Sequence, residues 1–354
     1  MKVVLVAMDV NPSNALLELK KKLEDNGHTV TDYIFSAKGR PISTDEFRAS
    51  IVSSDIVLCG MSSSKELANL EMAAAELAID SDRTLAFYVD ARGGYGKGAR
   101  QWFDSFKPYA DIVFIQRDDD VTSVSEQSPN ATICVASHPK YEKIPLLESR
   151  RDEIRRKLNV ENHEVMIVYS GSKIGPVNRE ILGFLNNVGG DARFRKFRIF
   201  FSPHPGDKND LGTYPIVNVG LLPRDVASGE EILAAGDVYI HNMMSTMLEA
   251  AMYLRKIAIC IQTPAVREAR STQASGELPR ECEEGVAFIA TSEQELQNLL
   301  LGVGTRSMDL RVRQQELYPA PPPVGTSVAK MTTAIEKFVI ETRTRAPASS
   351  LSGS

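Results

Sequence analysis

The chain has 354 residues, more than a single hydrophobic core usually serves, so we expect two domains. Apolar residues make up 43% and charged residues 25%, as in ordinary globular proteins, which excludes disordered, collagen-like and membrane-spanning classes. The formal net charge of -5 disfavours broad electrostatic binding to nucleic acid or anionic lipid.

The cysteines and the N-terminal residues indicate in which cellular compartment the protein is found. No C-x-x-C pair occurs, so neither a disulfide framework nor a zinc site is predicted. The opening MKVVLVAMDVN lacks a secretory h-region, and no run approaches the about 20 apolar residues that span a bilayer. We therefore expect a cytoplasmic protein with reduced thiols. The four cysteines are Cys59, Cys134, Cys260 and Cys282.

The first 145 residues repeat an apolar run, a polar turn and an amphipathic helix, which predicts parallel strands with crossover helices. Ser63 and Glu66 are predicted to form a capping box at the start of the third helix. The acidic segment Asp118–Asn130 is expected to be a surface connection. Strands are predicted at Lys2–Met8, Thr29–Phe35, Asp55–Gly60, Thr84–Asp90, Ala110–Gln116 and Ala131–Ala136, and helices at Asn14–Asn26, Ser43–Ser53 and from Ser63 to about Ile79.

After Pro145 the composition changes, and LLESRRDEIRRKLNVENHE predicts a charged helix that begins a second domain. Strands and helices then alternate again, so the sequence predicts two Rossmann-like, doubly wound α/β domains, residues 1–145 and 146–325, facing each other across a ligand cleft. Strands are predicted at Val165–Tyr169, Phe197–Phe201, Ile216–Val219, Val238–His241 and Ile257–Ile261, and helices at Val177–Asn187, Glu230–Ala235 and Met247–Leu254.

The C-terminal residues predict one more helix. Apolar side chains fall on one face of Ser327–Glu341, so residues 326–342 are expected to form a helix that packs back onto a core. Residues 343–354 are small and polar and predict a disordered tail. The apolar residues of the helix are Val328, Met331, Ile335, Phe338 and Val339.

This order of elements resembles the GT-B fold of nucleotide-sugar glycosyltransferases and of the related non-hydrolysing nucleotide-sugar epimerases. The passage ATICVASHPKYEKIPLLESRRDEIRRKLNV is similar to the family's crossover between domains. The resemblance implies an N-terminal acceptor domain, a C-terminal donor domain, and sugar transfer from a nucleotide-activated donor without a cofactor or metal. Four further similar pieces are YSGSKIGPVN, SPHPGDKN, GLLP and HNMMSTMLEAAMYLRKIAICI.

Two turns of the second half are candidates for donor binding. Ser170-Gly171-Ser172-Lys173 follows a predicted strand at the edge of a parallel sheet where ligands bind. Its small residues would let N–H groups approach a phosphate and Lys173 would add charge, unless this is an ordinary tight turn. His204 and Pro205 close another strand, and the resemblance implies that they contact the donor nucleotide or its phosphate. A histidine that bonds a nearby carbonyl is the alternative.

The GLLP segment and the turn before the helix MLEAAMYL complete the predicted donor site. GLLP, with Leu222, resembles the segment whose backbone reads the nucleotide base, and a plain loop is the alternative. The free N–H groups of the helix N-terminus predict diphosphate binding beside Ser245 and Thr246. Thr246 and Glu249 form a predicted capping box, and Glu249 either serves that cap or binds the ribose.

The first half offers acceptor-side candidates, because the resemblance implies that this domain supplies the catalytic base. Asp90, which ends an apolar strand before a Gly-rich loop, is the first candidate. Glycosyl transfer needs a general base near an acceptor hydroxyl, and a carboxylate with a pKa raised by partial burial would suit that role. Pairing with Arg92 or capping of the turn is the alternative for Asp90. Asp9 is the second candidate base, and Ser62, Ser63 and Arg92 are acceptor-side candidates.

Two further features have plainer interpretations. Asp118–Asp120 is expected to be solvated surface rather than a metal site, and Trp102 is expected to pack in the core with Phe103 and Phe106. The leading prediction is a glycosyltransferase that moves a sugar from a nucleotide-activated donor to an acceptor. A nucleotide-sugar epimerase or hydrolase, and a catalytically degenerate module that binds a ligand or partner protein, are the alternatives.

Overall fold

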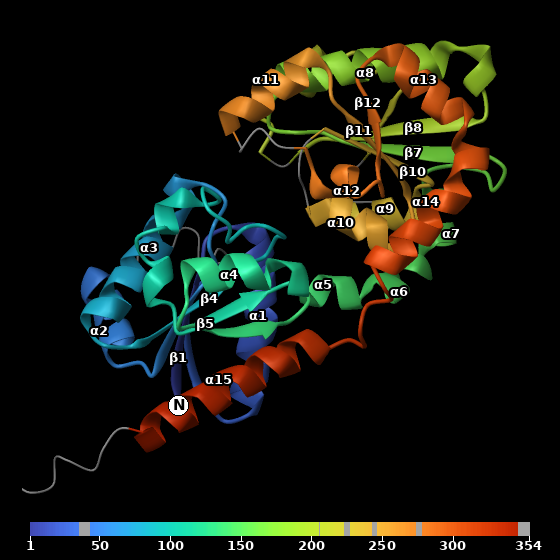
Figure 1. Cartoon of the computed structure of the whole chain (residues 1–354). Coiled ribbons are helices and arrows are strands. Elements are labelled where there is room, and N and C mark those ends of the chain that lie inside the picture. Colours follow the sequence, from blue (N-terminus) through green and yellow to red (C-terminus); the bar gives the residue numbers. More distant parts are fainter. Residues whose placement is uncertain (35–42, 205, 223–226, 243–245, 274–277, 346–354) are drawn as a thin grey trace, which may run out of the picture. The chain divides into compact units, whose positions relative to one another are not determined.

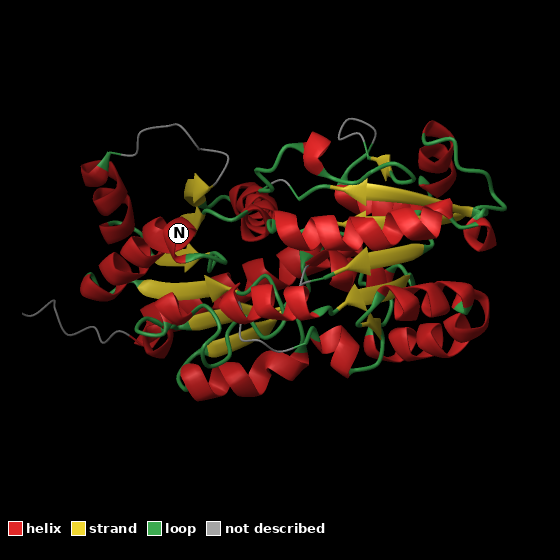
Figure 2. Cartoon of the chain, turned by 90° about the horizontal axis from the view of Figure 1, so that it is seen from above, coloured by secondary structure: helices red, strands yellow, loops and turns green. Residues whose placement is uncertain are grey.

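A computed structural model describes residues 1–34, 43–204, 206–222, 227–242, 246–273 and 278–345 of the chain (Figure 1). The chain divides into two compact units. The N-terminal unit contains Met1–Glu142 and the segment from Pro322 onward, and the C-terminal unit contains Lys143–Pro321. In each unit the strands lie between helices (Figure 2). Among the described residues, no helix is both long enough and apolar enough to cross a membrane.

The N-terminal unit is built on six parallel strands in the order β2-β1-β3-β4-β5-β6. All six were predicted, and the predicted bounds agree within two residues because each strand is a short apolar run between polar turns. The strands are β1 Lys2–Ala7, β2 Thr29–Ile34, β3 Ile56–Cys59, β4 Thr84–Tyr88, β5 Ile112–Ile115 and β6 Thr132–Val135.

Helices cover both faces of this sheet, which is why its central strands are apolar on both sides. One face packs on α1 and the C-terminal helix α15, and the other packs on α2, α3 and α4. Trp102 and Phe106 pack against this second core and Phe103 is fully buried in it, as predicted. The helices are α1 Val10–Asp25, α2 Thr44–Val52, α3 Lys65–Asp80, α4 Val121–Gln127, α5 Pro139–Glu142 and α15 Thr326–Arg345.

The C-terminal helix packs back onto the N-terminal unit, which confirms the prediction from its apolar face. Figure 1 shows α15 beside α1, and Val328, Met331 and Ile335 are buried in the core that the two helices share. Glu142 holds the start of α15, because its carboxylate accepts hydrogen bonds from the N–H groups of Gly325 and Ser327, each at 2.6 Å. The carboxylate thus satisfies backbone N–H groups that have no hydrogen-bond partner within the helix.

Two local predictions for the N-terminal unit were wrong. The N-cap of α3 is Ser64, whose hydroxyl accepts from Leu67 N, so Ser63 and Glu66 do not form the predicted capping box. The segment Asp118–Asn130 is more than a surface connection, since it contains α4, whose Val124 is fully buried. A pair of adjacent serines and a mixed polar segment carry too weak a local signal to decide either point.

The C-terminal unit has a second sheet of six parallel strands, in the order β12-β11-β10-β7-β8-β9. The chain builds outward from β7 to one side and then, from β10, to the other, which is the Rossmann order. The strands are β7 Val165–Ser170, β8 Phe197–Ser202, β9 Gly220–Leu221, β10 Val238–His241, β11 Ile257–Ile261 and β12 Phe288–Ala290.

Helices again cover both faces of the sheet. A core with α8, α11 and α13 fills one face, and a smaller core with α7 and α9 fills the other. The sheet and its helices confirm the predicted fold class of two Rossmann-like units. The helices are α6 Ile144–Glu148, α7 Arg151–Lys157, α8 Gly175–Gly190, α9 Gly229–Ala235, α10 Thr246–Tyr253, α11 Pro264–Gln273, α12 Arg280–Glu283, α13 Glu293–Leu301 and α14 Val303–Leu317.

The C-terminal unit also departs from the predictions. The predicted strand Ile216–Val219 is not a strand; the chain pairs with β8 only at Gly220–Leu221, where a side chain on Gly220 would come within 2.9 Å of Phe200 Cδ1. The predicted charged helix after Pro145 is two helices, α6 and α7. Strand β12 and helices α11 to α14 were not predicted, because their sequences lack a clean periodic pattern.

Candidate functional site

Three predicted donor segments follow neighbouring strands of the C-terminal sheet. Ser170–Lys173 follows β7, His204 follows β8, and the turn toward α10 follows β10. Because β7 lies between β10 and β8 and all are parallel, their carboxyl ends share one edge. The connections of β7 and β10 lead to opposite sides of the sheet, so this edge is the switch point where open α/β sheets bind ligands.

A buried amide holds the loop after β7. Asn178, on α8 and 0% exposed, accepts hydrogen bonds from Tyr169 Oη and Ser172 N, each at 2.9 Å, and donates to Ser172 O at 2.9 Å. Asn242, after β10, donates to Tyr169 Oη at 3.2 Å. The network therefore fixes the β7 and β10 loops to each other through side chains that the sequence interpretation did not single out.

The same network limits what the predicted phosphate loop can donate. The N–H of Ser172 bonds to Asn178, and the N–H of Gly171 bonds to Ser202 O at 3.0 Å. Both groups are satisfied within the protein, as in an ordinary tight turn. The predicted phosphate contact of this loop therefore depends on Lys173.

The side chains of Lys173 and His204 both lie close to Gly206. A side chain on Gly206 would lie 3.2 Å from His204 Nδ1 and 3.2 Å from Lys173 Cε. His204 Nδ1 accepts a hydrogen bond from Gly206 N at 2.9 Å, which places the proton of the neutral ring on Nε2. Both candidates for phosphate binding thus lie at one turn, and the backbone orients the imidazole ring. Pro205 lies outside the described residues.

Replacing Gly171 by alanine tests the packing of this loop. The added methyl would lie 2.7 Å from Phe201 Cε2, and Phe201 is fully buried against Tyr169, so overpacking should lower the free energy of unfolding by about 1–3 kcal/mol. Urea unfolding followed by circular dichroism measures it. Gly183→Ala, on α8 with nothing within 4 Å, is the control and should stabilise. Equal effects of the two changes would contradict the expected strain.

The remaining donor candidates are only partly described. Leu222 has its side chain in the core and its N–H bonded to Phe201 O at 2.9 Å, so base reading would have to use other backbone groups. Helix α10 begins at Thr246, which makes that residue part of the helix and not the predicted N-cap, since an N-cap has non-helical backbone angles. Glu249 is buried in the first turn. Ser245 and the side chain of Thr246 lie outside the described residues.

The N-terminal unit has its own switch point, between β1 and β3. Asp9, the N-cap of α1, follows β1, and its carboxylate accepts hydrogen bonds from Val10 N at 2.8 Å, Ser63 N at 3.2 Å and Ser63 Oγ. Burial acts to raise the pKa of Asp9, but these hydrogen bonds and the charge of Arg100 together lower it below its ordinary value. Such a carboxylate stays ionised and is a weak base.

Glu71 is the residue that the sequence interpretation missed. It is 0% exposed on α3 and accepts hydrogen bonds from Met8 N at 2.9 Å, Ser62 N at 2.6 Å and Ser62 Oγ at 2.7 Å. Burial raises its pKa to about 7, against the opposing effect of these bonds and of Arg100. A signal did exist, because Glu71 lies in the apolar helical stripe of Ala68, Ala75 and Ala78.

Asp90 ends the strand run of β4 and is 5% exposed, as predicted for a partly buried carboxylate. Its partner is Arg100, not the predicted alternative Arg92, which instead pairs with Asp119. Arg100 also acts electrostatically on Asp9 and Glu71, so it links the three carboxylates. No sequence pattern indicated Arg100, because it follows the Gly-rich loop ten residues after Asp90.

The acidic run Asp118–Asp120 is not simply solvated surface. Asp120 is buried and accepts a hydrogen bond from Gly93 N at 2.9 Å, so the run anchors the Gly-rich loop after β4. Backbone strain occurs beside the carboxylates, since Met61 and Arg100 have left-handed φ values of 51° and 49°. Within the described residues, no group of three His, Cys, Asp or Glu side chains is arranged to hold a metal.

No protein-family model matches the chain, and no curated protein sequence matches it. Solved structures do match it. The chain is similar to S. aureus MnaA in a structure with UDP, at 13% identity and a TM-score of 0.64, covering 98% of each chain. It is also similar to a Neisseria meningitidis UDP-GlcNAc 2-epimerase bound to UDP-GlcNAc, at 12% identity and a TM-score of 0.60, covering 96% of this chain and 100% of the other.

A third similar structure is the wall teichoic acid polymerase TagF, at 12% identity and a TM-score of 0.60, covering 96% of this chain and 90% of that one. These likenesses extend over nearly the whole chain although the sequence identity is low. Together with the two parallel sheets they confirm the resemblance stated from the sequence: the protein has the GT-B fold.

Proposed function

We propose that the protein is an enzyme that binds a nucleotide-sugar at the carboxyl edge of the C-terminal sheet and transfers its sugar to an acceptor, without a cofactor or metal. The observation that carries the proposal is the convergence of the β7, β8 and β10 loops at the switch point. The solved structures of similar fold that contain UDP or UDP-GlcNAc support a nucleotide-sugar as the ligand.

The chemistry of the switch point suits a diphosphate. Lys173 and His204 lie against one glycine, and His204 Nε2 can donate to a phosphate oxygen because Nδ1 is held by the backbone. The N-terminus of α10 adds a partial positive charge at the same edge. On this proposal Glu249, in the first turn of α10, contacts the ribose.

Binding is tested by calorimetric titration of UDP, GDP, CMP and ADP and of the sugars linked to them. His204→Ala should weaken the binding of the preferred nucleotide about tenfold, as expected for loss of a hydrogen bond to a charged group. His163→Ala is the matched control, because His163 is an exposed histidine just before β7, at the opposite end of the strand. Failure of every nucleotide to bind, or equal loss in both variants, would refute the proposed site.

Epimerisation or hydrolysis of the donor is the second candidate. It is favoured by the buried carboxyl groups Asp90 and Glu71, since proton removal at a sugar carbon needs such groups, and by the similarity to a UDP-GlcNAc 2-epimerase. Incubation of the donor alone, followed by proton NMR, separates the two. Product without acceptor favours epimerase or hydrolase, and product only with acceptor favours the transferase. Binding without product in either case favours a non-catalytic module.

A further inference from the structure

The opposite edge of the C-terminal sheet carries a basic cavity. It has a volume of about 380 Å³ and is lined by side chains from α7, from the start of β10, from the turn between α10 and β11, and from α14. We call it the amino-edge pocket. Its lining residues are Arg151, Asp237, Leu254, Arg255, Lys256 and Arg311.

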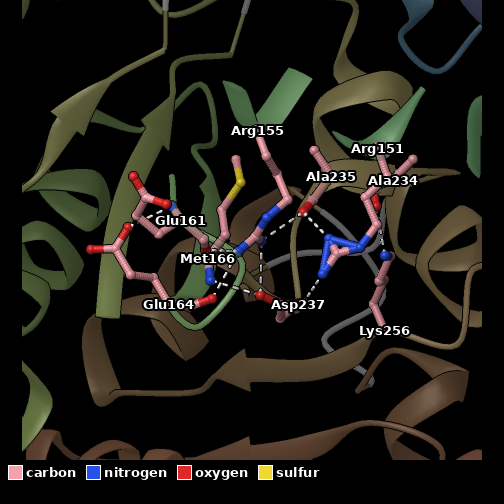
Figure 3. Close-up of polar contacts among 9 residues, drawn as sticks. All are labelled: Arg151, Arg155, Glu161, Glu164, Met166, Ala234, Ala235, Asp237 and Lys256. Carbon is pink, nitrogen blue, oxygen red and sulfur yellow. Dashed lines mark hydrogen bonds and ion pairs between the residues drawn. The ribbon is translucent and has the colours of Figure 1, made fainter. Parts of the chain in front are cut away.

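Asp237 is the only carboxylate in the lining, and its negative charge is already paired with arginine side chains. Asp237 accepts hydrogen bonds from Arg151 at 2.6 Å, Arg155 at 3.1 Å and Met166 N at 2.8 Å (Figure 3). Arg155 is 2% exposed, and within the described chain its other hydrogen bonds go to the carbonyl oxygens of Ala235, Glu161 and Glu164, so it is a structural residue. Asp237 is therefore shared between Arg151 and Arg155. The other cations of the lining, Lys256, Arg255 and Arg311, form no ion pair with a described residue.

Lys256 is the most deeply placed of these cations. Its ammonium donates to Ala234 O at 2.7 Å and forms no ion pair with the described residues (Figure 3). Burial lowers its pKa to about 8, and the charges of Arg151 and Arg311 act in the same direction, against those of Asp237 and Glu148. It is still mainly protonated at pH 7. A partly buried ammonium without an ion pair is unfavourable, and a bound anion would reduce that penalty.

The other two cations face neutral groups or solvent. Arg255 donates to the carbonyl oxygens of Met252 at 2.7 Å, Gln314 at 3.2 Å and Tyr318 at 2.5 Å, which fixes the guanidinium without neutralising it. Arg311 is exposed on α14 and has no ion pair within the described chain. Among the described residues, Glu148, on α6, is a further carboxylate that acts on Lys256 and Arg255. The cations of the lining outnumber Glu148 and Asp237 together.

We propose that the amino-edge pocket binds a phosphate-bearing small molecule, with Lys256 and Arg311 contacting the phosphate dianion beside the ion pair of Arg151 with Asp237. Guanidinium groups match phosphate oxygens in pairs, and an ammonium adds a compact charge beside them. The volume suits a small ligand. The ligand is either free phosphate or the phosphate group of a larger molecule, and this site is separate from the carboxyl edge of the same sheet.

Calorimetry with inorganic phosphate on the full chain, in the presence of saturating UDP, tests the pocket. Lys256→Met and Arg311→Gln should each weaken phosphate binding about tenfold or more. Lys196→Met and Arg195→Gln are the matched controls, because both residues are exposed cations just before β8 at the same edge and outside the pocket. Circular dichroism confirms that each variant folds.

The outcomes separate the possibilities. Binding that survives UDP and falls only in the pocket variants supports the proposal, and tighter binding of a phosphorylated sugar than of phosphate identifies the larger ligand. No phosphate binding, loss in the control variants as well, or displacement by UDP would overturn it. If UDP itself does not bind, the comparison of variants still tests the pocket, so failure of the proposed function is distinguishable.

A proton-linked measurement adds a readout that structural damage would not produce. An anion facing Lys256 should raise its pKa, so binding of sulfate, which does not titrate, should take up a proton at about pH 8.5. The charged groups that face Lys256 are those of Arg151, Asp237, Glu148 and Arg311. Calorimetry in two buffers of different ionisation enthalpy measures the uptake. Proton uptake that persists in Lys256→Met would contradict the assignment.

Discussion

Replacing Asp90 by asparagine is expected to lower the turnover number by about 10²–10⁴-fold, while the affinity for the donor nucleotide stays unchanged. The side chain is nearly buried at the end of β4 and pairs with Arg100. Asparagine keeps an oxygen that can accept from Arg100, so the local geometry should persist. It cannot take a proton from an acceptor hydroxyl, and the loss should therefore appear in the turnover number.

The measurement is steady-state kinetics with the donor identified by titration, together with the melting temperature of each variant. Asp80→Asn is the control, because Asp80 is an exposed carboxylate at the end of α3. A turnover number within a few-fold of wild type would remove Asp90 from the catalytic role. A loss of activity in proportion to a fall in melting temperature would assign Asp90 to folding through its ion pair with Arg100.

The fold could be predicted because its signal is local. Each strand of the N-terminal unit is a run of apolar residues bounded by polar turns, and α15 carries its apolar residues at helical spacing. Where the local signal is weak the predictions failed. Strand β9 has only two residues, and its pairing depends on how closely Gly220 approaches Phe200, which no sequence window contains.

The candidate site was predicted in its positions but not in its partners. Residues that follow predicted strands could be chosen as site candidates from the sequence, and these are Asp9, Ser62, Ser63 and Asp90. That Asp9 bonds to Ser63, 54 residues away, follows from the order of β1 and β3 in the sheet. The same order places Glu71, on α3, beside the ends of both strands. Long-range strand order thus decides which carboxylates share a neighbourhood, and a single sequence does not contain it.

The amino-edge pocket illustrates the same limit. Arg151 and Arg155 lie in a segment that the sequence marks only as a charged helix, a pattern typical of solvated surface. Arg155 is instead almost fully buried because it joins α7 to the carbonyl oxygens before β7 and to Asp237 before β10. The remaining cations come from α7, the α10–β11 turn and α14, which are far apart in the chain.

Stability of the N-terminal unit is expected to fall by about 3 kcal/mol between pH 4.5 and pH 7 because of Glu71 alone. The pKa of this carboxyl is raised from its ordinary value of 4.5 to about 7 by burial. Below pH 4.5 it is protonated in both the folded and the unfolded chain. Between the two values only the unfolded chain releases the proton, so the free energy of unfolding decreases as pH rises, and the full loss is present above pH 7.

Glu71→Gln should abolish this slope, because glutamine does not titrate. The amide offers one acceptor oxygen where the carboxyl group offers two to Met8 and Ser62, so the variant should start about 1–2 kcal/mol less stable at acidic pH. Its deficit should shrink or reverse by about pH 8, since only wild type then carries a buried charge.

Urea unfolding followed by fluorescence measures this slope in the right part of the protein. Trp102 is the one tryptophan of the chain and packs against the same core cluster as α3, so its signal reports on the N-terminal unit within the full-length protein. Glu76→Gln is the control, because Glu76 is exposed on the same helix and should leave the wild-type slope intact. Parallel pH profiles for wild type and Glu71→Gln would mean that Glu71 is ionised in the folded protein with an ordinary pKa, held by its three hydrogen bonds.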